Sequence, residues 1–176
     1  MVLSRSTWGA ASSSSGVARL RLVGTGGEQT LGGGFLSQPR GRYFPRHAML
    51  LAIGPYWSQT AASLRSVTEW TGTAWQPVAG IASDFDAFCL LETPAGDPLV
   101  GGHRGGSTVV MRRIQSGWVE HHVASALLYP QSVVMVGAQD FFVAAGPFGM
   151  TPIYRYVGGV GTLLHNPLAT SGLFLD

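Results

Sequence analysis

The chain has 176 residues, of which 45% are hydrophobic and 11% are charged, and its formal net charge at pH 7 is +2. This composition excludes a largely disordered chain, because enough apolar surface is present to form a core, and the small charge, spread over scattered arginines, argues against nucleic-acid binding. The single cysteine, Cys89, excludes an internal disulfide framework, and no run of 18 apolar residues is present to form a transmembrane helix.

The first 15 residues are rich in serine, alanine and glycine. This composition is typical of a flexible arm, and the segment lacks the apolar centre of a signal peptide. We therefore expect residues 1–15 to be an arm and residues 16–176 to form one domain.

A two-strand motif recurs along the rest of the chain. Each copy has a strand, a turn that contains glycine, and a second strand. The copies are 16–31, 65–78, 108–123 and 151–165. The residues predicted to end the first strands, at spacings of 48, 44 and 42 residues, are Leu22, Trp70, Ile114 and Tyr156. A period near 44 residues is typical of four-stranded β-propeller blades.

A second motif, an apolar strand followed by small residues, precedes three of these copies. Its glycines, at spacings of 48 and 44 residues, are Gly54, Gly102 and Gly146. Two motifs with a similar period indicate a true repeat, and one complete unit can be assigned in full. Its four antiparallel strands are predicted at 86–92, 98–102, 108–114 and 118–123.

The predicted strands group into blades. Complete four-stranded blades are expected at 40–78, 86–123 and 131–165, whereas residues 16–31 supply only half a blade. Residues 171–176 resemble a lone strand, and closure of a ring by the two termini is slightly preferred over completion by a partner. The predicted fold class is therefore all-β and propeller-like, with about four degenerate antiparallel blades.

Alternation along the strands assigns side chains to faces. Thr68 and Trp70 share one face of their strand, and Tyr154 and Tyr156 share one face of theirs, opposite Arg155. The aromatic residues expected to fill the space between neighbouring blades are Trp70, Trp75, Trp118 and Tyr156.

One stretch of sequence resembles a known repeat family. EWTGTAWQPV (69–78), followed by DAFCLLETPAGDPLVGG (86–102), resembles the kelch-like propeller repeats of large bacterial and phage surface proteins. The resemblance is best over 65–123 and loose over 16–176. The sequence departs from the family pattern, because TGT or QSG replaces its WDG-type turn and the first and last copies lack the tryptophan. The resemblance implies a propeller fold but no single function, since propellers include enzymes, lectins and scaffolds.

Exposed aromatic residues on connections between strands are the first candidates for binding. Propeller ligands usually meet two sets of connections on one face, which here contain Tyr129 and the pair His103 and Arg104. Tyr56 and Trp57 begin the longest connection of this kind. The arginines of segment 40–47, which a simple blade would not need, are further expected contacts: Arg40, Arg42 and Arg46.

Catalysis and metal binding are not expected. Asp84 and Asp86 could form a polar site with His103, but aspartate is common in turns because its side chain bonds to nearby backbone. His121 and His122 are adjacent on a strand and therefore point to opposite faces, so they cannot both ligate one metal. We expect no enzyme activity, no metal and no cofactor.

Three functions remain as hypotheses. The first is a non-catalytic structural module of a bacteriophage virion (tail, fibre or capsid-associated), which docks through loops and strand edges on other protein subunits, its own copies included. The second is a carbohydrate-binding propeller that recognises a surface glycan. The third and least supported is a glycoside hydrolase, because the arginine cluster and Tyr/Glu pair of sialidase-like propellers have no clear equivalent. The first hypothesis places the protein on a virion or extracellular particle, with neither nucleic acid nor membrane as its partner.

Overall fold

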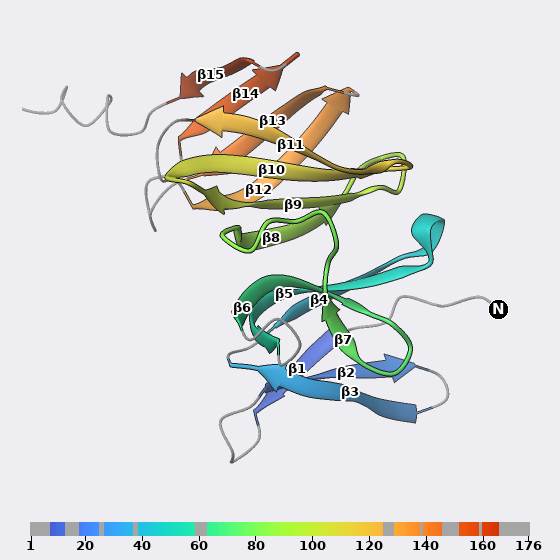
Figure 1. Ribbon diagram of the computed structural model, residues 1–176. Helices are drawn as coiled ribbons and strands as arrows, with labels where there is room; N and C mark the ends of the chain where they lie inside the picture. Colours follow the sequence, from blue (N-terminus) through green and yellow to red (C-terminus); the bar gives the residue numbers. More distant parts are fainter. Residues whose placement is uncertain are drawn as a thin grey trace, which may run out of the picture. The chain divides into compact units, whose positions relative to one another are not determined.

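The computed structural model describes residues 8–12, 18–24, 27–36, 39–58, 63–124, 129–137, 139–145, 152–158 and 160–165. These residues form β-strands and one short 3-10 turn, with no α-helix among them (Figure 1). The chain divides into two compact units, residues 1–86 and 87–176, where one domain was predicted. The all-β prediction is confirmed for the described part of the chain.

The first unit contains one seven-stranded antiparallel sheet, in the order β1-β2-β3-β5-β6-β7 with β4 paired to β5. Its strands are β1 (Trp8–Ser12), β2 (Ala18–Gly24), β3 (Gly27–Phe35), β4 (Arg40–Phe44), β5 (Met49–Ser58), β6 (Ser63–Trp70) and β7 (Trp75–Pro77). Strands β4 to β7 each pair with the next one along the chain, and this four-stranded meander coincides with the predicted blade at 40–78.

Strand β1 lies inside the segment that was predicted to be a flexible arm. It pairs with β2 from Trp8, opposite Leu22, to Ser12, opposite Ala18. Backbone hydrogen bonds hold an antiparallel pair together even without apolar alternation, so a segment rich in alanine and serine can still form a strand. The predicted half-blade at 16–31 is present as the β2–β3 hairpin, but it has this third strand and continues into the β4–β7 meander.

The second unit contains two four-stranded antiparallel meanders (Figure 1). The first comprises β8 (Asp86–Glu92), β9 (Pro98–Arg104), β10 (Ser107–Ile114) and β11 (Gly117–Ala124). The second comprises β12 (Pro130–Gly137), β13 (Asp140–Ala145), β14 (Ile153–Val157) and β15 (Val160–His165). The predicted blades at 86–123 and 131–165 are confirmed as four-stranded sheets, with outer bounds that differ by no more than one residue.

The repeat period is confirmed in these meanders, although two predicted strand ends were wrong. Trp70 and Ile114 end their strands as predicted and lie 44 residues apart. Strand β14 ends at Val157 rather than Tyr156, and β2 ends at Gly24 rather than Leu22. The hairpin turn after β14 therefore begins one residue later than predicted, and the turn after β2 begins two residues later.

The two sheets of the second unit pack face to face around one hydrophobic core. Its buried members are Cys89, Leu99, Val110, Val123, Val133, Phe141, Val143 and Tyr156. Tyr156 stacks on Phe141 with ring centroids 4.5 Å apart, and Tyr154 packs against the same core. Arg155 points away from it, with 46% of its side chain exposed. The predicted faces of β14 and the role of Tyr156 between neighbouring sheets are therefore confirmed.

Aromatic residues also form the core of the first unit. Trp75 is buried, and its ring lies 5.5 Å from that of Phe35 and 5.4 Å from that of Trp70. Thr68 is fully buried on the same face, where its hydroxyl donates to the Ala52 carbonyl over 3.4 Å. The tryptophans of the β6–β7 hairpin are therefore packing residues, as the alternation predicts.

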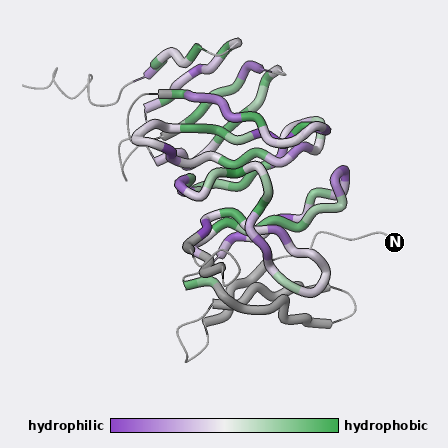
Figure 2. The backbone as a smooth tube through the Cα atoms, in the orientation of Figure 1, coloured by the Kyte–Doolittle hydropathy of each residue, from purple (hydrophilic) through white to green (hydrophobic). Residues whose placement is uncertain are grey.

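The middle strands of the β8–β11 sheet are buried on both faces. Leu99 and Val110 belong to the core described above, whereas their neighbours Val100 and Val109 point the other way and are also fully buried. Figure 2 shows hydrophobic residues along these strands. A strand buried on both faces has a continuous apolar sequence rather than a strict alternation.

Two glycines allow the sheets of the second unit to approach closely. A Cβ atom at Gly161, on β15, would collide with the carbonyl oxygen of Val123 on β11. A Cβ atom at Gly101, on β9, would lie 2.7 Å from the Cys89 sulfur and 3.2 Å from Pro130. The spacing of the two sheets therefore depends on the absence of side chains at these positions.

We predict that Gly161→Ala lowers the free energy of unfolding by about 1–3 kcal/mol, because the added methyl group forces β15 away from β11. Urea denaturation monitored by fluorescence measures the change. Gly137→Ala is the matched control, since its Cβ would meet the nearest heavy atom, on Asp140, at 3.4 Å, an ordinary contact. Equal destabilisation by the two substitutions would contradict the close approach.

Candidate functional site

Tyr56 and Trp57 lie within a strand and not at the start of a loop. Strand β5 was predicted to stop at Gly54 but continues to Ser58. Gly54 has a φ of 141°, and the pairing with β6 shifts register between Ile53 and Tyr56, which is a β-bulge. Because of the bulge, the strand continues beyond Gly54. The small residue at this position was therefore wrongly predicted to end the strand. The side chains of Tyr56 and Trp57 lie outside the described part of the structure.

The arginine-rich segment 40–47 was predicted to be an inserted segment, but it is part of the sheet. Arg40 and Arg42 belong to β4, the first strand of its meander, and Arg46 lies in the 3-10 turn Pro45–His47 that leads into β5. The guanidinium of Arg42 lies 5.8 Å from the centroid of the Phe44 ring, and Phe44 is fully buried. The segment is therefore needed to complete the four-stranded sheet, and Arg46 is exposed in its turn.

His103 and Arg104 were predicted to lie in a connection between strands. They are instead the last two residues of β9. The turn that follows is only Gly105–Gly106, with φ angles of 56° and 81°. A two-residue turn of this kind requires positive φ at both positions, which glycine supplies at no steric cost. The strand can therefore run on to Arg104, and consecutive residues then project to opposite faces.

His103 lies in a cluster of three rings, which we call the aromatic cluster: Phe88, His103 and Tyr129. The His103 centroid is 4.8 Å from Phe88 and 5.0 Å from Tyr129, and the Phe88 and Tyr129 rings meet edge to face at 5.1 Å. His103 is only 7% exposed, whereas Tyr129 is 48% exposed. Tyr129, which lies in a connection as predicted, and His103, which lies on β9, are thus close together.

Phe88 was missed by the sequence analysis. It belongs to the apolar run of β8, between Ala87 and Cys89, and such a run predicts core packing. The pattern of apolar residues around Phe88 does not indicate that its ring contacts Tyr129. Tyr129 immediately precedes β12, so the contact joins the start of one meander to the first strand of the previous one.

Arg104 belongs to a separate polar group on the same sheet. Its Nη1 donates to Glu120 Oε2 over 2.6 Å, and Glu120 Oε1 lies 2.9 Å from His122 Nε2. His122 is 65% exposed and Glu120 is 20% exposed. The Glu120 carboxylate therefore contacts both Arg104 and His122. This geometry is typical of an ion pair that stabilises the fold.

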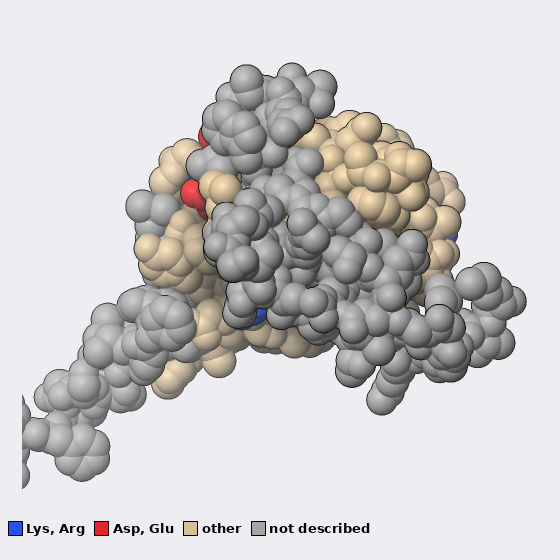
Figure 3. All heavy atoms as spheres, turned by 90° about the horizontal axis from the view of Figure 1, so that it is seen from below, with Lys and Arg blue, Asp and Glu red and all other residues tan. Residues whose placement is uncertain are grey.

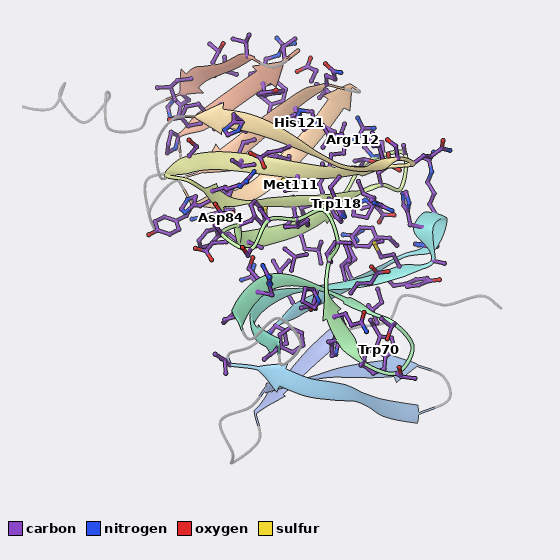
Figure 4. All side chains as sticks on the ribbon, viewed as in Figure 1. Trp70, Asp84, Met111, Arg112, Trp118 and His121 are labelled. Carbon is purple, nitrogen blue, oxygen red and sulfur yellow. The ribbon has the colours of Figure 1, made fainter. Side chains whose placement is uncertain are left out.

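The aspartates considered for a polar site are both exposed. Asp84 lies in the turn before β8, where Figure 4 labels it, and Asp86 is the first residue of that strand. Among the described residues, no three His, Cys, Asp or Glu side chains gather in a group that could hold a metal ion.

His121 and His122 point to opposite faces, as predicted. His121 lies between the two sheets of the second unit, with its ring 5.5 Å from Phe141 and 5.4 Å from Tyr156. Burial lowers the pKa of His121 below its ordinary value, and the positive charge of nearby Arg112 lowers it further (Figure 4). Arg112 in turn pairs with the buried Asp97, whose Oδ2 lies 3.3 Å from Arg112 Nη2.

One face of the β12–β15 sheet packs in the core, and we call the other its outer face. Cross-strand partners share a face, and the outer face has two such rows. The first row is Val134, Phe142, Arg155 and Thr162, and the second is Asp140, Val157 and Val160. The exposed aliphatic residues on this face are Val134 (57%), Val136 (59%), Ile153 (37%), Val157 (47%) and Val160 (66%).

The charged residues of the outer face neutralise each other. Arg155 donates to both oxygens of the Asp140 carboxylate, from Nη2 over 2.7 Å and from Nε over 3.2 Å. These hydrogen bonds lower the pKa of Asp140 and raise the pKa of Arg155. Arg155 also lies over the Phe142 ring, 5.7 Å from its centroid. The outer face is therefore mainly apolar, with one ion pair, and it also carries Thr162 and His165, the cross-strand partners of Arg155 and Ile153.

Comparison with known proteins finds no family model that matches the chain and no matching curated protein. The kelch-like character of the repeats therefore stays a prediction. In the described residues, no helix is both long and apolar enough to cross a membrane.

We predict that His121 makes the stability of the fold depend on pH. Its pKa is lower in the folded protein than the ordinary value of 6.5, so the unfolded chain binds the proton more readily. The stability is complete above pH 6.5 and falls as the pH decreases below that value. Thermal unfolding between about pH 7.5 and 5.5 measures this dependence.

His121→Gln is expected to flatten the dependence, because it removes the group whose protonation opposes folding. His122→Gln is the matched control, since the neighbouring side chain is 65% exposed. If wild type and His121→Gln lost stability equally on acidification, the role of His121 would be refuted.

Proposed function

We propose that this protein is a non-catalytic structural module, whose four-stranded meanders act as propeller-like blades that pack on protein neighbours in a larger assembly. The observation that carries this proposal is the outer face of the β12–β15 sheet. The middle strands of the β8–β11 sheet are buried on both faces, whereas the β12–β15 sheet leaves five aliphatic side chains exposed on one face. An exposed, mainly apolar face of this kind is typical of a protein–protein interface.

The charge pattern supports docking of this face on protein. Only 11% of the residues are charged. Figure 3 shows one side of the molecule, from below, where few of the visible described atoms belong to charged residues. On the outer face, the Arg155 guanidinium and the Asp140 carboxylate are already paired. Docking therefore does not strand an unpaired charge away from water, which is the main electrostatic cost of burying a surface.

Within this class of function, we propose a component of a bacteriophage virion (tail, fibre or capsid-associated). The support is the repeat pattern, which resembles the kelch-like repeats of bacterial and phage surface proteins, together with the low charge. The partners are then other protein subunits of the particle, and the contacts are the outer face and the strand edges.

The mass of the protein in solution tests the proposal. Light scattering across a concentration series is expected to give a mass above 18.6 kDa that rises with concentration. Val160→Lys should weaken this association without lowering the melting temperature, because Val160 is 66% exposed. Gln115→Lys adds the same charge in the exposed turn between β10 and β11 and should leave association unchanged. A monomer at every concentration would count against the proposal.

The aromatic cluster favours carbohydrate binding as a second candidate function. The exposed part of the Tyr129 ring is held by its contacts with Phe88 and His103. A rigid, half-exposed aromatic ring is a suitable surface for a sugar ring, because little conformational freedom is lost on binding. The same geometry also serves to cover the edge of the core, so binding has to be measured.

A glycan array tests this second function. If the cluster binds sugar, Tyr129→Ala is expected to weaken binding at least about tenfold, whereas Tyr129→Phe keeps the ring and most of the affinity. Trp57→Ala tests the candidate on β5 in parallel. The carbohydrate function is rejected if the wild-type protein binds no glycan, or if Tyr129→Ala binds as tightly as wild type.

A further inference from the structure

We infer that the outer face of the β12–β15 sheet packs on the same face of a second copy of this chain, forming a symmetric dimer. This inference rests on the proposed function and names the partner. The face is defined by its exposed aliphatic residues Val134, Val136, Ile153, Val157 and Val160, around the Arg155–Asp140 pair.

The sequence of β12 is typical of a strand that is buried on both faces. Residues 133–136 are Val-Val-Met-Val, a continuous apolar run of the kind found in strands buried on both faces. The middle strands of the other meander, β9 and β10, have continuous apolar runs of this kind and are buried on both faces, whereas β12 is the first strand of its meander and lies at the edge of its sheet. In β12 the inward residue Val133 is buried at 6% exposure, but Val134 and Val136 are 57% and 59% exposed.

The interface inside the second unit shows what covers such a face. There, one four-stranded meander packs on another through valine, leucine and aromatic side chains. The outer face presents valine and isoleucine side chains on the opposite side of the same sheet, so another meander is a suitable neighbour. A second copy of the β12–β15 sheet supplies one.

The charges on the outer face favour a second copy over a charged partner. Arg155 and Asp140 satisfy each other, so two copies can meet without like-charge repulsion. In a dimer with two-fold symmetry the same patch is used on both subunits, and this arrangement is by far the commonest in soluble homo-oligomers. A neutral apolar face with valines at both edges of the sheet, Val134 on β12 and Val160 on β15, is suited to pairing with itself.

The size of the face fits a weak dimer. Five aliphatic side chains, each roughly half exposed, leave on the order of 500 Å² of apolar surface on one copy and about 1,000 Å² on two, near the lower limit for a specific interface. We therefore expect a dissociation constant in the micromolar range, so that both monomer and dimer are seen across an ordinary concentration series.

A charge-swap experiment tests whether the face meets itself. One variant carries Val134→Lys and Val160→Lys, and the other carries Val134→Glu and Val160→Glu. All four substitutions are at exposed positions, so both variants should keep the wild-type melting temperature. Sedimentation velocity of each variant and of an equimolar mixture measures association, with Gln115→Lys as a control that keeps the outer face intact.

The expected result is a wild-type dimer of twice 18.6 kDa. Each variant alone should associate at least tenfold more weakly, because like charges meet across the symmetric interface. The mixture should recover association, because lysines of one copy then face glutamates of the other. If wild type associates but the mixture does not recover, the face packs on a different surface, and the symmetric dimer is refuted while the proposed function stands.

A wild-type monomer at every concentration would overturn the dimer. Maleimide labelling of Val160→Cys then identifies what replaces the dimer, with buried Cys89 as the slow background. Protection of the new cysteine in the monomer shows that the chain covers the face itself, as in a closed ring. Rapid labelling shows a bare face and leaves only a partner of another kind.

Discussion

The close packing of one four-stranded meander on the next is the constraint on which the second unit depends. Neither sheet could bury the aliphatic side chains of its inward face without the other, since a lone antiparallel sheet leaves both faces in water. The approach is so close that Gly161 and Gly101 have no room for a Cβ atom. The hydrophobic core, the position of His121 between the sheets and the contact of Tyr129 with the previous meander all follow from this packing.

Polar groups are accommodated around this core by local pairing. Asp97 is only 5% exposed, but its backbone exchanges hydrogen bonds with Thr93 across the β8–β9 turn and its carboxylate binds Arg112. A buried charge without a partner would destabilise the sheet by several kcal/mol. The turn therefore anchors Arg112, and Arg112 in turn keeps His121 neutral over a wider pH range.

The strand bounds of the second unit could be predicted closely because the pattern of side chains marks where its strands begin and end. Apolar runs end at glycines or at turn residues, and the turn at 93–97 has Gly96 with a φ of 85° at its tip. The errors lie where the backbone alone decides the structure. Pairing of β1 needs no apolar alternation, and the bulge at Gly54 extends β5 through Tyr56 and Trp57.

The candidate sites were predictable only in part, for a related reason. Relative loop position was enough to bring Tyr129 to His103, but no local pattern marks Phe88 as their neighbour. The apolar run at 133–136 predicts a strand, yet it does not tell whether its second face is covered by the same chain or by another. That distinction depends on tertiary packing, which the periodicity of one strand does not contain.

The pairing pattern of the second unit has a consequence for how the protein is made and how it changes. Every strand from β8 to β15 pairs only with strands next to it in the chain. Contacts between residues close in sequence form quickly, so the strands of each meander can pair with one another as the chain leaves the ribosome, before the two sheets pack together. Because the hydrogen-bond ladder of one meander contains no strand of the other, duplication or loss of a whole meander in a gene would leave the remaining ladder intact.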